Sequence, residues 1–334
     1  MFARLRFLFV AAALAATLGL LSTGNAQVVM KLGHDQPATS THQTAALKFK
    51  QLVDERTHGQ IKVNIFPAMM LGSGTQMVEQ VEAGALEAAV LPTAWIAPVA
   101  PGVQVLDLPF LFPNRQVAYE VLDGPAGAQI LKPLEKKNIG GVAFWEGGFK
   151  QFTGTFPIRQ PGDYQGHKIR TMPAPVIQEQ FKAFGAAPAT IDFKELYSAL
   201  QQHVVDGQEN PIATIALMKF YEVQKYLTLS DHGYIAYVFM INKPFLDKLT
   251  SDQRKAVIES AQEAGRYQRD LIRESEQGYL AMFGKAGLEI IKLTPEERAK
   301  FAAASKPVYD WFVQRYGGAS LDLVRDAVAA AQKK

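Results

Sequence analysis

The stretch that begins at Val28 carries the pattern that most restricts the fold of this chain. Val28 to Gly33 predicts a short strand, apolar residues at helical spacing follow until Gly59, and Ile61 to Phe66 alternates like a half-buried strand. Two strands separated by a helix favour parallel pairing with a crossover connection. The pattern therefore predicts an α/β protein.

The loop after the first predicted strand is a candidate ligand site. It lies at the carboxyl end of the strand, which is the edge where open α/β sheets bind ligands. Asp35, Ser40 and His42 lie in this loop and are candidate contacts. Residues of these types at such positions are more often ordinary loop or helix-capping residues, and both interpretations stay open.

Residues 1–26 have the pattern of a secretion signal. Arg4 and Arg6 provide a charged start, Phe7 to Leu21 is an uncharged apolar run, and small residues lead up to Ala26. We expect cleavage after Ala26 and export to the periplasm, with an uncleaved N-terminal anchor as the alternative. A bacterial lipoprotein is excluded because the sequence has no cysteine.

The composition of the remaining chain argues against several functional classes. Removal of Arg4 and Arg6 would lower the formal net charge from +3 to +1, which gives no strong attraction to nucleic acid or acidic lipid. Without cysteine there are no disulfides or thiolate metal ligands, so stability must come from a large core. Residues 27–334 are enough for two lobes and hold no apolar run of membrane-spanning length. We expect a soluble monomer.

Three segments in the first half have local interpretations. Gly72-Ser-Gly-Thr75 could cradle a phosphate before a helix, but the Walker lysine is missing and an ordinary helix start explains the glycines. Ala88 to Pro92 predicts a buried strand that delivers Trp95 toward the ligand-binding edge, where the indole could line a pocket or belong to the core. Val103 to Phe112 predicts an apolar extended stretch.

Gly147 and Gly148 predict a hinge between lobes. Ile139 to Glu146 predicts a strand, and two glycines directly after it permit the backbone angles that a crossing requires. Lys150 follows. If the crossing lines a cleft, Lys150 is a cation in that cleft; otherwise it is an exposed lysine.

Arg170 is the strongest candidate for a ligand anchor. His167 to Met172 predicts a short strand closed by Pro173, so the guanidinium lies at a strand end. Arginine presents a planar fork of donors that matches a carboxylate through two parallel hydrogen bonds. A solvated surface arginine is the alternative.

A second polar cluster strengthens this interpretation. Gln208, Glu209 and Asn210 follow a turn at Asp206-Gly207 and reach a predicted strand edge. Amide side chains can both donate to and accept from a bound acid. We therefore expect this cluster to lie in the same lobe as Arg170.

Together the two polar segments resemble a known family. Gly166-His-Lys-Ile-Arg170 with Pro173, followed by Asp206-Gly-Gln-Glu-Asn-Pro211, is similar to the substrate-binding subunits of TRAP transporters (tripartite ATP-independent periplasmic, DctP type). The resemblance covers essentially the whole chain after residue 26, and three further segments share it: Leu108–Phe112, Phe220–Tyr226 and Asn242-Lys243.

The resemblance implies two α/β lobes, joined by crossing strands and a long helix, that close over an organic acid. It implies that Arg170 pairs with the ligand carboxylate, that Asn210 contacts it and that Phe193 forms an aromatic wall. Lys150 falls where sialic-acid and dicarboxylate binders of the family tend to have a second arginine, so a second anionic group on the ligand is less firmly implied. Pro92 stands where sialic-acid binders have a glutamate, which argues against sialic acid.

The C-terminal half fits this architecture. Tyr234 to Ile241 predicts an apolar strand that returns to the first lobe, and Tyr237 could reach the cleft. Residues 251–283 predict one long helix bridging both lobes; a coiled-coil dimer seam is the rival, but sustained heptads are missing. We expect lobe I to comprise residues 27–147 and 236–275, and lobe II residues 148–235 and 276–334.

The expected function is capture of an organic acid without chemistry and its delivery to the small and large membrane subunits of a TRAP transporter. We expect no cofactor and no nucleic-acid partner, and we assign no metal-binding residues. Whether a metal ion accompanies the acid stays open, and Glu209 would be a natural oxygen ligand for one. The ligand candidates are C4-dicarboxylates, 2-oxo or 2-hydroxy monocarboxylates, and aromatic acids. The expected ligand-binding residues are Arg170, Asn210, Phe193, Lys150, Trp95, Asp35, Gln208 and Tyr237.

The alternative is a secreted enzyme acting on a small carboxylate. A hydrolase would need a recognisable nucleophile or metal motif, and the sequence has no Gly-x-Ser-x-Gly, no cysteine and no His-Glu-x-x-His. Glu146 and Glu209 could form an acid/base pair, but their spacing does not support one. We therefore expect a protein that is not an enzyme.

Overall fold

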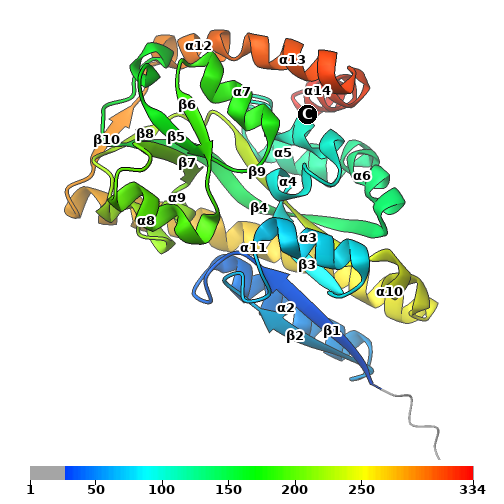
Figure 1. Cartoon of the computed structure of the whole chain (residues 1–334). Coiled ribbons are helices and arrows are strands. Elements are labelled where there is room, and N and C mark those ends of the chain that lie inside the picture. Colours follow the sequence, from blue (N-terminus) through cyan, green and yellow to red (C-terminus); the bar gives the residue numbers. More distant parts are fainter. Residues whose placement is uncertain (1–26, 334) are drawn as a thin grey trace, which may run out of the picture.

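The computed structural model describes residues 27–333, so the predicted secretion signal lies outside the described residues. Ten strands form one continuous sheet with helices packed around it (Figure 1). The order along the main path is β2-β1-β3-β9-β4-β7-β5-β6, and β8 pairs with both β4 and β10. The strands are β1 Val28–His34, β2 Ile61–Phe66, β3 Ala88–Pro92, β4 Ile139–Gly154, β5 Lys168–Thr171, β6 Ala187–Thr190, β7 Gly207–Pro211, β8 Tyr226–Leu229, β9 Tyr234–Asn242 and β10 Glu289–Lys292.

The N-terminal strands confirm the predicted parallel unit. β1 pairs in parallel with both β2 and β3, and the crossover from β1 to β2 is helix α2, Thr41–Arg56. Ser40 is the N-cap of α2 and accepts a hydrogen bond from the backbone N–H of Gln43. Ser40 therefore caps a helix, which is the local role considered for it from sequence.

β4 joins the two halves of the sheet. One, called the N-terminal half below, contains β2, β1, β3 and β9, and the other contains β7, β5, β6, β8 and β10. Its first part pairs antiparallel with β9, from Ile139 opposite Asn242 to Phe149 opposite Tyr234. Its second part pairs with β7 and β8. The expectation that this strand ends at Glu146 is wrong, because pairing with β9 continues through a register shift between Glu146 and Gly148. The two glycines are thus accommodated as an irregularity inside a long strand, where Gly148 has φ +109°.

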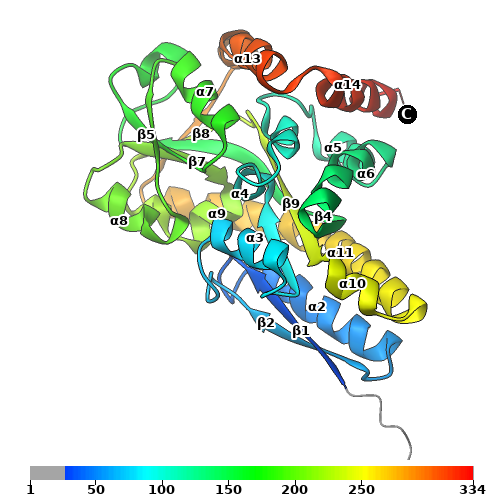
Figure 2. The ribbon, with the colours of Figure 1, turned by 45° about the vertical axis from the view of Figure 1, so that its right-hand side comes forward.

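Helices cover both faces of the sheet (Figure 2). The expected extended stretch at 103–112 is wrong in its first part, because Pro101 opens a 3-10 helix whose apolar side chains are buried. The remaining helices are α3 Gly74–Ala83, α4 Thr93–Ile96, η2 Pro101–Asp107, α5 Arg115–Leu122, α6 Pro125–Leu131, η3 Lys132–Lys137, η4 Pro161–Tyr164, α7 Pro175–Ala183, η5 Phe193–Glu195, α8 Leu196–Gln201, α9 Ile212–Leu217, η6 Phe220–Glu222, α10 Lys243–Lys248, α11 Ser251–Lys285, α12 Pro295–Ala304, α13 Lys306–Tyr316 and α14 Ala319–Ala331.

The predicted long helix is α11, which has 35 residues and begins with a capping box between Thr250 and Gln253. It packs on α2 beside the N-terminal strands, along β4, and on α9 and β10 in the other half of the sheet. Trp145 of β4 donates its indole N–H to the carbonyl of Ala261, with a distance of 2.9 Å. The helix therefore contacts both halves of the sheet, as expected.

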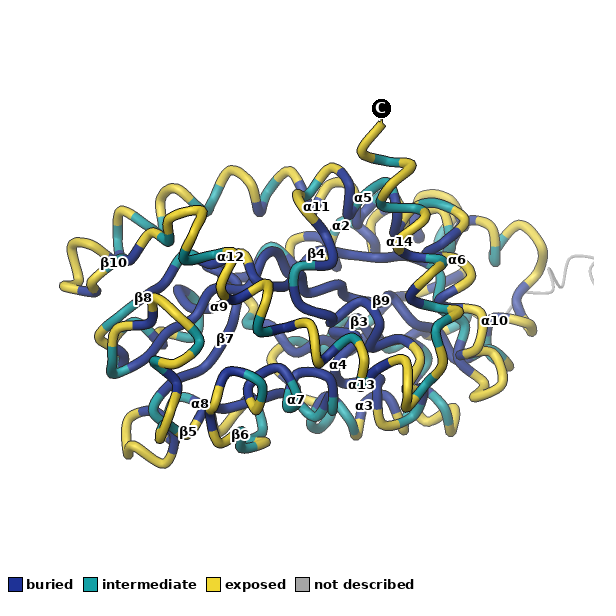
Figure 3. The backbone as a smooth tube through the Cα atoms, turned by 90° about the horizontal axis from the view of Figure 1, so that it is seen from above, coloured by how far each residue is buried: buried dark blue, intermediate teal, exposed yellow. Residues whose placement is uncertain are grey.

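The last two C-terminal helices pack on different parts of the chain. α13 packs on α7 and η2, whereas α14 packs on α5, α6 and η2 (Figure 1). α5 and α6 belong to the stretch expected in lobe I, whereas residues 276–334 are expected in lobe II, so α14 packs across the predicted division, which stays a prediction. The buried residues concentrate along the central strands (Figure 3). Within residues 27–333 the structure contains no helix whose length and apolar character would suit a membrane crossing.

Candidate functional site

Arg170 is a buried cation with unused hydrogen-bonding capacity. It lies in β5 and is 1% exposed. Its Nε donates to the carbonyl of Ile191 at 3.0 Å, and its Nη2 has no hydrogen-bond partner within residues 27–333. Burial lowers the pKa of the guanidinium to about 10, although the nearby carboxylates of Glu209, Asp192 and Asp35 oppose this shift. An interior guanidinium in this state favours an anion beside it.

Phe193 lies against Arg170. The guanidinium carbon is 5.9 Å from the centroid of the Phe193 ring, and Phe193 in turn meets Phe220 edge to face. Asp192 caps the short helix η5 by accepting from the backbone of Lys194. This cap fixes the position of Phe193 next to the buried cation.

Asp35 follows β1 directly, and it is 5% exposed. The hydroxyl of Tyr237 donates to Asp35 Oδ2 at 3.1 Å, and Gln36 donates to the Tyr237 hydroxyl at 2.8 Å. Asp35 Oδ1 is buried and accepts no hydrogen bond from the described residues. Burial raises the pKa of Asp35 to about 7, and hydrogen bonds from Tyr237, Gln36 and its own backbone amide, together with the charge of Arg170, oppose the shift. Asp35 and Arg170 therefore lie within electrostatic reach of each other.

Two hydrogen bonds connect the two halves of the molecule near these residues. Lys194, next to Phe193, donates its Nζ to the carbonyl of Met69 at 2.7 Å. The backbone N–H of Val176 at the start of α7 donates to Gln104 Oε1 of η2 at 3.0 Å. The segments that carry Arg170 and Phe193 thus touch segments of the N-terminal half.

Gln208 and Asn210 lie on the same face of the sheet as Arg170. β5 and β7 are parallel and pair Ile169 with Gly207, so strand alternation places these three side chains on one face. Asn210 Nδ2 donates to Gln208 Oε1, and Gln208 Nε2 donates to Thr153 Oγ1 at 2.8 Å. The two amides therefore hold each other in place beside the arginine.

Lys150 occupies the opposite face and is already paired. It is fully buried, and its Nζ lies 2.6 Å from Glu209 Oε1. Glu209 Oε2 lies 2.6 Å from His232 Nε2 and accepts from Gln180 at 3.0 Å. Burial would raise the pKa of Glu209, but Lys150 and His232 hold it well below its ordinary value. Lys150 is therefore neither an exposed lysine nor a free cation.

His232 was not anticipated from the sequence. It stacks on the Phe152 ring with centroids 3.7 Å apart and shares a 2.7 Å hydrogen bond with Ser230. Burial lowers its pKa to about 4, although Glu209 opposes this shift. Only the strand pairing that brings Glu209 next to Phe152 reveals this position, and no local motif marks it.

Trp95 and His42 are both buried. Trp95 packs on Gly74 so tightly that a Cβ at Gly74 would lie 2.4 Å from the indole. The His42 ring lies 4.3 Å from the Tyr237 ring. Burial lowers the pKa of His42 to about 3. His42 therefore supports Tyr237 from behind, whereas Trp95 packs on the start of α3.

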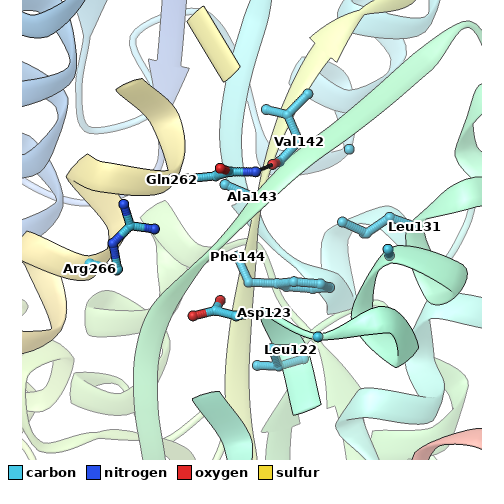
Figure 4. Close-up of a pocket in the computed structure, with 11 residues that line it drawn as sticks. Leu122, Asp123, Leu131, Val142, Ala143, Phe144, Gln262 and Arg266 are labelled. Carbon is cyan, nitrogen blue, oxygen red and sulfur yellow. Dashed lines mark hydrogen bonds between the residues drawn. The ribbon is translucent and has the colours of Figure 1, made fainter. Parts of the chain in front are cut away.

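A surface cavity of about 210 Å³ is lined by a different set of residues (Figure 4). It is lined by the ends of α5 and α6, by β4, and by Gln262 and Arg266 of α11. Gln262 points toward Val142 and donates to its carbonyl at 3.4 Å (Figure 4). None of the residues expected to bind a ligand lines this cavity. In the described part of the chain, histidine and acidic side chains form no group of three or more that could hold a metal ion.

Comparison with known sequences identifies relatives over most of the chain. The model of the family described as bacterial extracellular solute-binding protein, family 7 (DctP), matches residues 32–315. The 2,3-diketo-L-gulonate-binding periplasmic protein YiaO of Escherichia coli strain K12 is 36% identical over 287 residues, which are 85% of this chain and 87% of that protein. The C4-dicarboxylate-binding periplasmic protein DctP of Rhodobacter capsulatus is 34% identical over 306 residues, 90% of this chain and 91% of that protein.

Solved structures agree with these relatives. A TRAP periplasmic solute binding protein from Desulfovibrio salexigens with bound orotic acid has a TM-score of 0.88 and 32% identity, covering 91% of this chain and 99% of that one. The sugar acid binding protein DctPAm from Advenella mimigardefordensis in complex with galactonate has a TM-score of 0.87 and 34% identity, covering 91% and 98%. The chain therefore belongs to family 7 of the bacterial extracellular solute-binding proteins, the periplasmic solute-binding proteins of TRAP transporters, which are not enzymes.

Proposed function

We propose that this protein captures the carboxylate of an organic acid at Arg170 and delivers the acid to the small and large membrane subunits of a TRAP transporter. The observation that carries the proposal is the buried guanidinium, whose Nη2 has no hydrogen-bond partner in residues 27–333. None of the ion pairs among these residues includes Arg170, so its charge is not neutralised by a direct contact. A ligand carboxylate would supply the missing partner.

The ligands of the relatives support a carboxylate. The related proteins are named for 2,3-diketo-L-gulonate and C4-dicarboxylates, and the related structures hold orotic acid and galactonate. Each of these molecules carries at least one carboxylate group. The carboxylate that these molecules share is the kind of hydrogen-bond acceptor that Arg170 Nη2 lacks.

The remaining contacts are proposed from their positions around Arg170. Asn210 and Gln208 share its face of the sheet, and Phe193 lies against the guanidinium. Asp35 and Tyr237 approach from the N-terminal half. Lys150 and Trp95, which we also expected to touch the ligand, have partners of their own in Glu209 and Gly74.

We propose that the two halves of the molecule act as lobes that part to admit the acid and close around it. Closure excludes water, which strengthens charge-assisted hydrogen bonds. The hydrogen bonds from Lys194 to Met69 and from Val176 to Gln104 would break when the lobes part. We further propose that residues 1–26 are cleaved after export and that the processed protein is a monomer.

The proposal is tested by calorimetric titration of the processed protein with a panel of organic acids. Arg170→Ala should abolish binding of every acid that the wild type binds. Arg266→Ala is the matched control, because Arg266 is an exposed arginine on α11 that lines the distant surface cavity. If Arg170→Ala binds the same acids with unchanged affinity, or if no acid binds the wild type, the proposed role of Arg170 is wrong.

A further inference from the structure

We infer that Asp35 accepts a hydrogen bond from a hydroxyl group of the bound acid and thereby selects hydroxylated monocarboxylates over dicarboxylates. The inference rests on the proposed function, because it takes Arg170 as the partner of the ligand carboxylate. It adds a specificity-determining residue on the side of the site that faces the N-terminal half. The same residue then defines the chemical class of the ligand.

The first argument is the unused oxygen of Asp35. Tyr237 and Gln36 both direct their donors to Oδ2, at 3.1 and 3.3 Å, whereas Oδ1 receives no donor from the described residues. Asp35 is only 5% exposed, so bulk water has little access to take the place of the missing donor. A buried carboxyl oxygen without a partner carries a desolvation cost that a ligand hydroxyl removes.

The second argument is the position of Asp35 relative to Arg170. Asp35 follows β1 and Arg170 lies in β5, and these strands belong to different halves of the sheet, yet each side chain feels the charge of the other. Each also holds one buried polar atom without a partner: an acceptor on Asp35 and a donor on Arg170. A molecule with a carboxylate at one end and a hydroxyl along its chain satisfies both atoms.

The third argument is that a second carboxylate would lack a cation. Lys150, the obvious candidate, lies on the opposite face of the sheet and is bound to Glu209 at 2.6 Å. Lys194 is exposed and donates to the carbonyl of Met69. Above pH 7, where Asp35 is ionised, a second carboxylate placed near it would instead meet a like charge, which disfavours it.

The Tyr237 hydroxyl keeps Asp35 in this role. It accepts from Gln36 and donates to Oδ2, so its single proton is already used. Tyr237 therefore orients the carboxyl group so that Oδ1 is left for the ligand. Tyr237 is in this sense a positioning residue.

The test is calorimetric titration with two matched series of acids. The four-carbon series is butyrate, 2,3,4-trihydroxybutyrate and succinate, and the six-carbon series is hexanoate, gluconate and adipate. In the series that binds, we expect the hydroxy acid to bind the wild type at least about 10-fold more tightly than the plain acid and the dicarboxylate, the size expected of a hydrogen bond to a charged group. Asp35→Asn should reduce this preference to within about 3-fold, because an amide is a weaker acceptor and can donate to a carboxylate. The control is Asp326→Asn, an exposed position on α14.

The outcomes separate this inference from the proposed function. If the dicarboxylate binds the wild type as tightly as the hydroxy acid, the inference is wrong. A protonated Asp35 that donates a hydrogen bond to a second carboxylate would give this outcome. An unchanged preference in Asp35→Asn overturns it as well. In both cases loss of binding in Arg170→Ala would leave the proposed function intact. If no acid of either series binds the wild type, the inference is wrong, and the proposed function fails as well only if the wider panel of organic acids gives no binding either.

Discussion

Lys150 and Glu209 form a fully buried ion pair, with 2.6 Å between Nζ and Oε1, on the face of β4 and β7 that lies opposite Arg170. His232 and Gln180 complete the hydrogen bonding of the same carboxylate. Lys150 and Arg170 are thus interior cations in contrasting states: Lys150 is neutralised by a direct ion pair, and Arg170 is not. We therefore expect Lys150 to contribute to stability, whereas Arg170 is the residue that we propose for the ligand carboxylate.

Removal of Lys150 should therefore be costly for folding. Lys150→Met leaves Glu209 charged in the interior without its main partner, and we expect the free energy of unfolding to fall by about 3 kcal/mol. The double variant Lys150→Met/Glu209→Gln should lose less than the single one, because no uncompensated charge remains. Urea unfolding measures both. Lys255→Ala, which removes an exposed ion pair with Glu259, is the control and should change stability by less than about 1 kcal/mol. A Lys150→Met protein as stable as the wild type would show that the pair is not structural.

Asp35 should make stability depend on pH in a defined direction. Burial raises its pKa from 3.8 to about 7 in the folded protein, so between these values the folded state holds a proton that the unfolded state has lost. The contribution of Asp35 to stability is therefore present below pH 3.8 and is lost as the pH rises toward 7. Asp35→Asn has no titrating carboxyl group at this position, so it does not lose stability in this way as the pH rises. Its stability relative to the wild type should increase between pH 4 and pH 7 and stay constant above.

Urea unfolding of the two proteins at pH 5, 6, 7 and 8 checks this prediction. The stability of Asp35→Asn must be compared with that of the wild type at each pH. His42 and His232, whose pKa values are lowered by burial, shift the stability of both proteins in the opposite direction over the same range. Asp326→Asn, an exposed substitution, should show no such trend. A pH-independent difference between Asp35→Asn and the wild type would mean that Asp35 is ionised in the folded protein throughout.

Much of this arrangement could be predicted from local sequence. The strand before Asp35, the strand ending at Pro173 and the long helix after Thr250 all follow from periodicity, turn residues and capping signals that act over a few positions. These same signals located Asp35 and Arg170 at the ends of strands. The resemblance to TRAP solute-binding proteins supplied the two-lobe architecture.

The long-range partners of these side chains and elements could not be predicted from such local signals. Lys150 and Glu209 are 59 positions apart, and only the antiparallel pairing of β4 with β7 brings them together. The continuation of β4 past Gly147 depends on β9, which pairs on both sides of the irregularity. The position of α14 on α5 and α6 likewise depends on a contact between the chain end and its first half. Such long-range pairings leave no periodic signal in the sequence.

Arg170 should lower the free energy of unfolding of the ligand-free protein. Its guanidinium is buried with an unpartnered Nη2, so its replacement by an apolar side chain of similar length removes a desolvation penalty. We expect Arg170→Met to raise the free energy of unfolding without ligand by about 1 kcal/mol and to eliminate the stabilisation by bound acid. Thermal unfolding with and without ligand measures both effects. Arg269→Met is the contrasting variant, because Arg269 is paired with Asp123 and its loss should destabilise the protein. If Arg170→Met were as destabilising as Arg269→Met, Arg170 would be a structural residue.

Two glycines of α11 should respond in opposite ways to the same substitution. A Cβ at Gly265 would lie 2.6 Å from the indole of Trp145 and 3.1 Å from the carbonyl oxygen of Phe144, so the helix could not keep its contact with β4. A Cβ at Gly278 would meet nothing within 4 Å. Both changes add about 1 kcal/mol of helix propensity, but at Gly265 the overpacking outweighs this gain.

We therefore expect Gly265→Ala to lower the free energy of unfolding by about 1–2 kcal/mol and Gly278→Ala to raise it by up to about 1 kcal/mol. Urea unfolding of the two variants provides the measurement, and Trp145 fluorescence reports on the disturbed contact in Gly265→Ala. Because both substitutions are chemically identical and lie in one helix, their difference isolates the packing of α11 on β4. Equal effects at the two positions would show that α11 does not press on Trp145. The connection between the long helix and the strand that joins both halves of the sheet would then have to depend on other contacts, such as the hydrogen bonds of Gln268 to the backbone of Glu146.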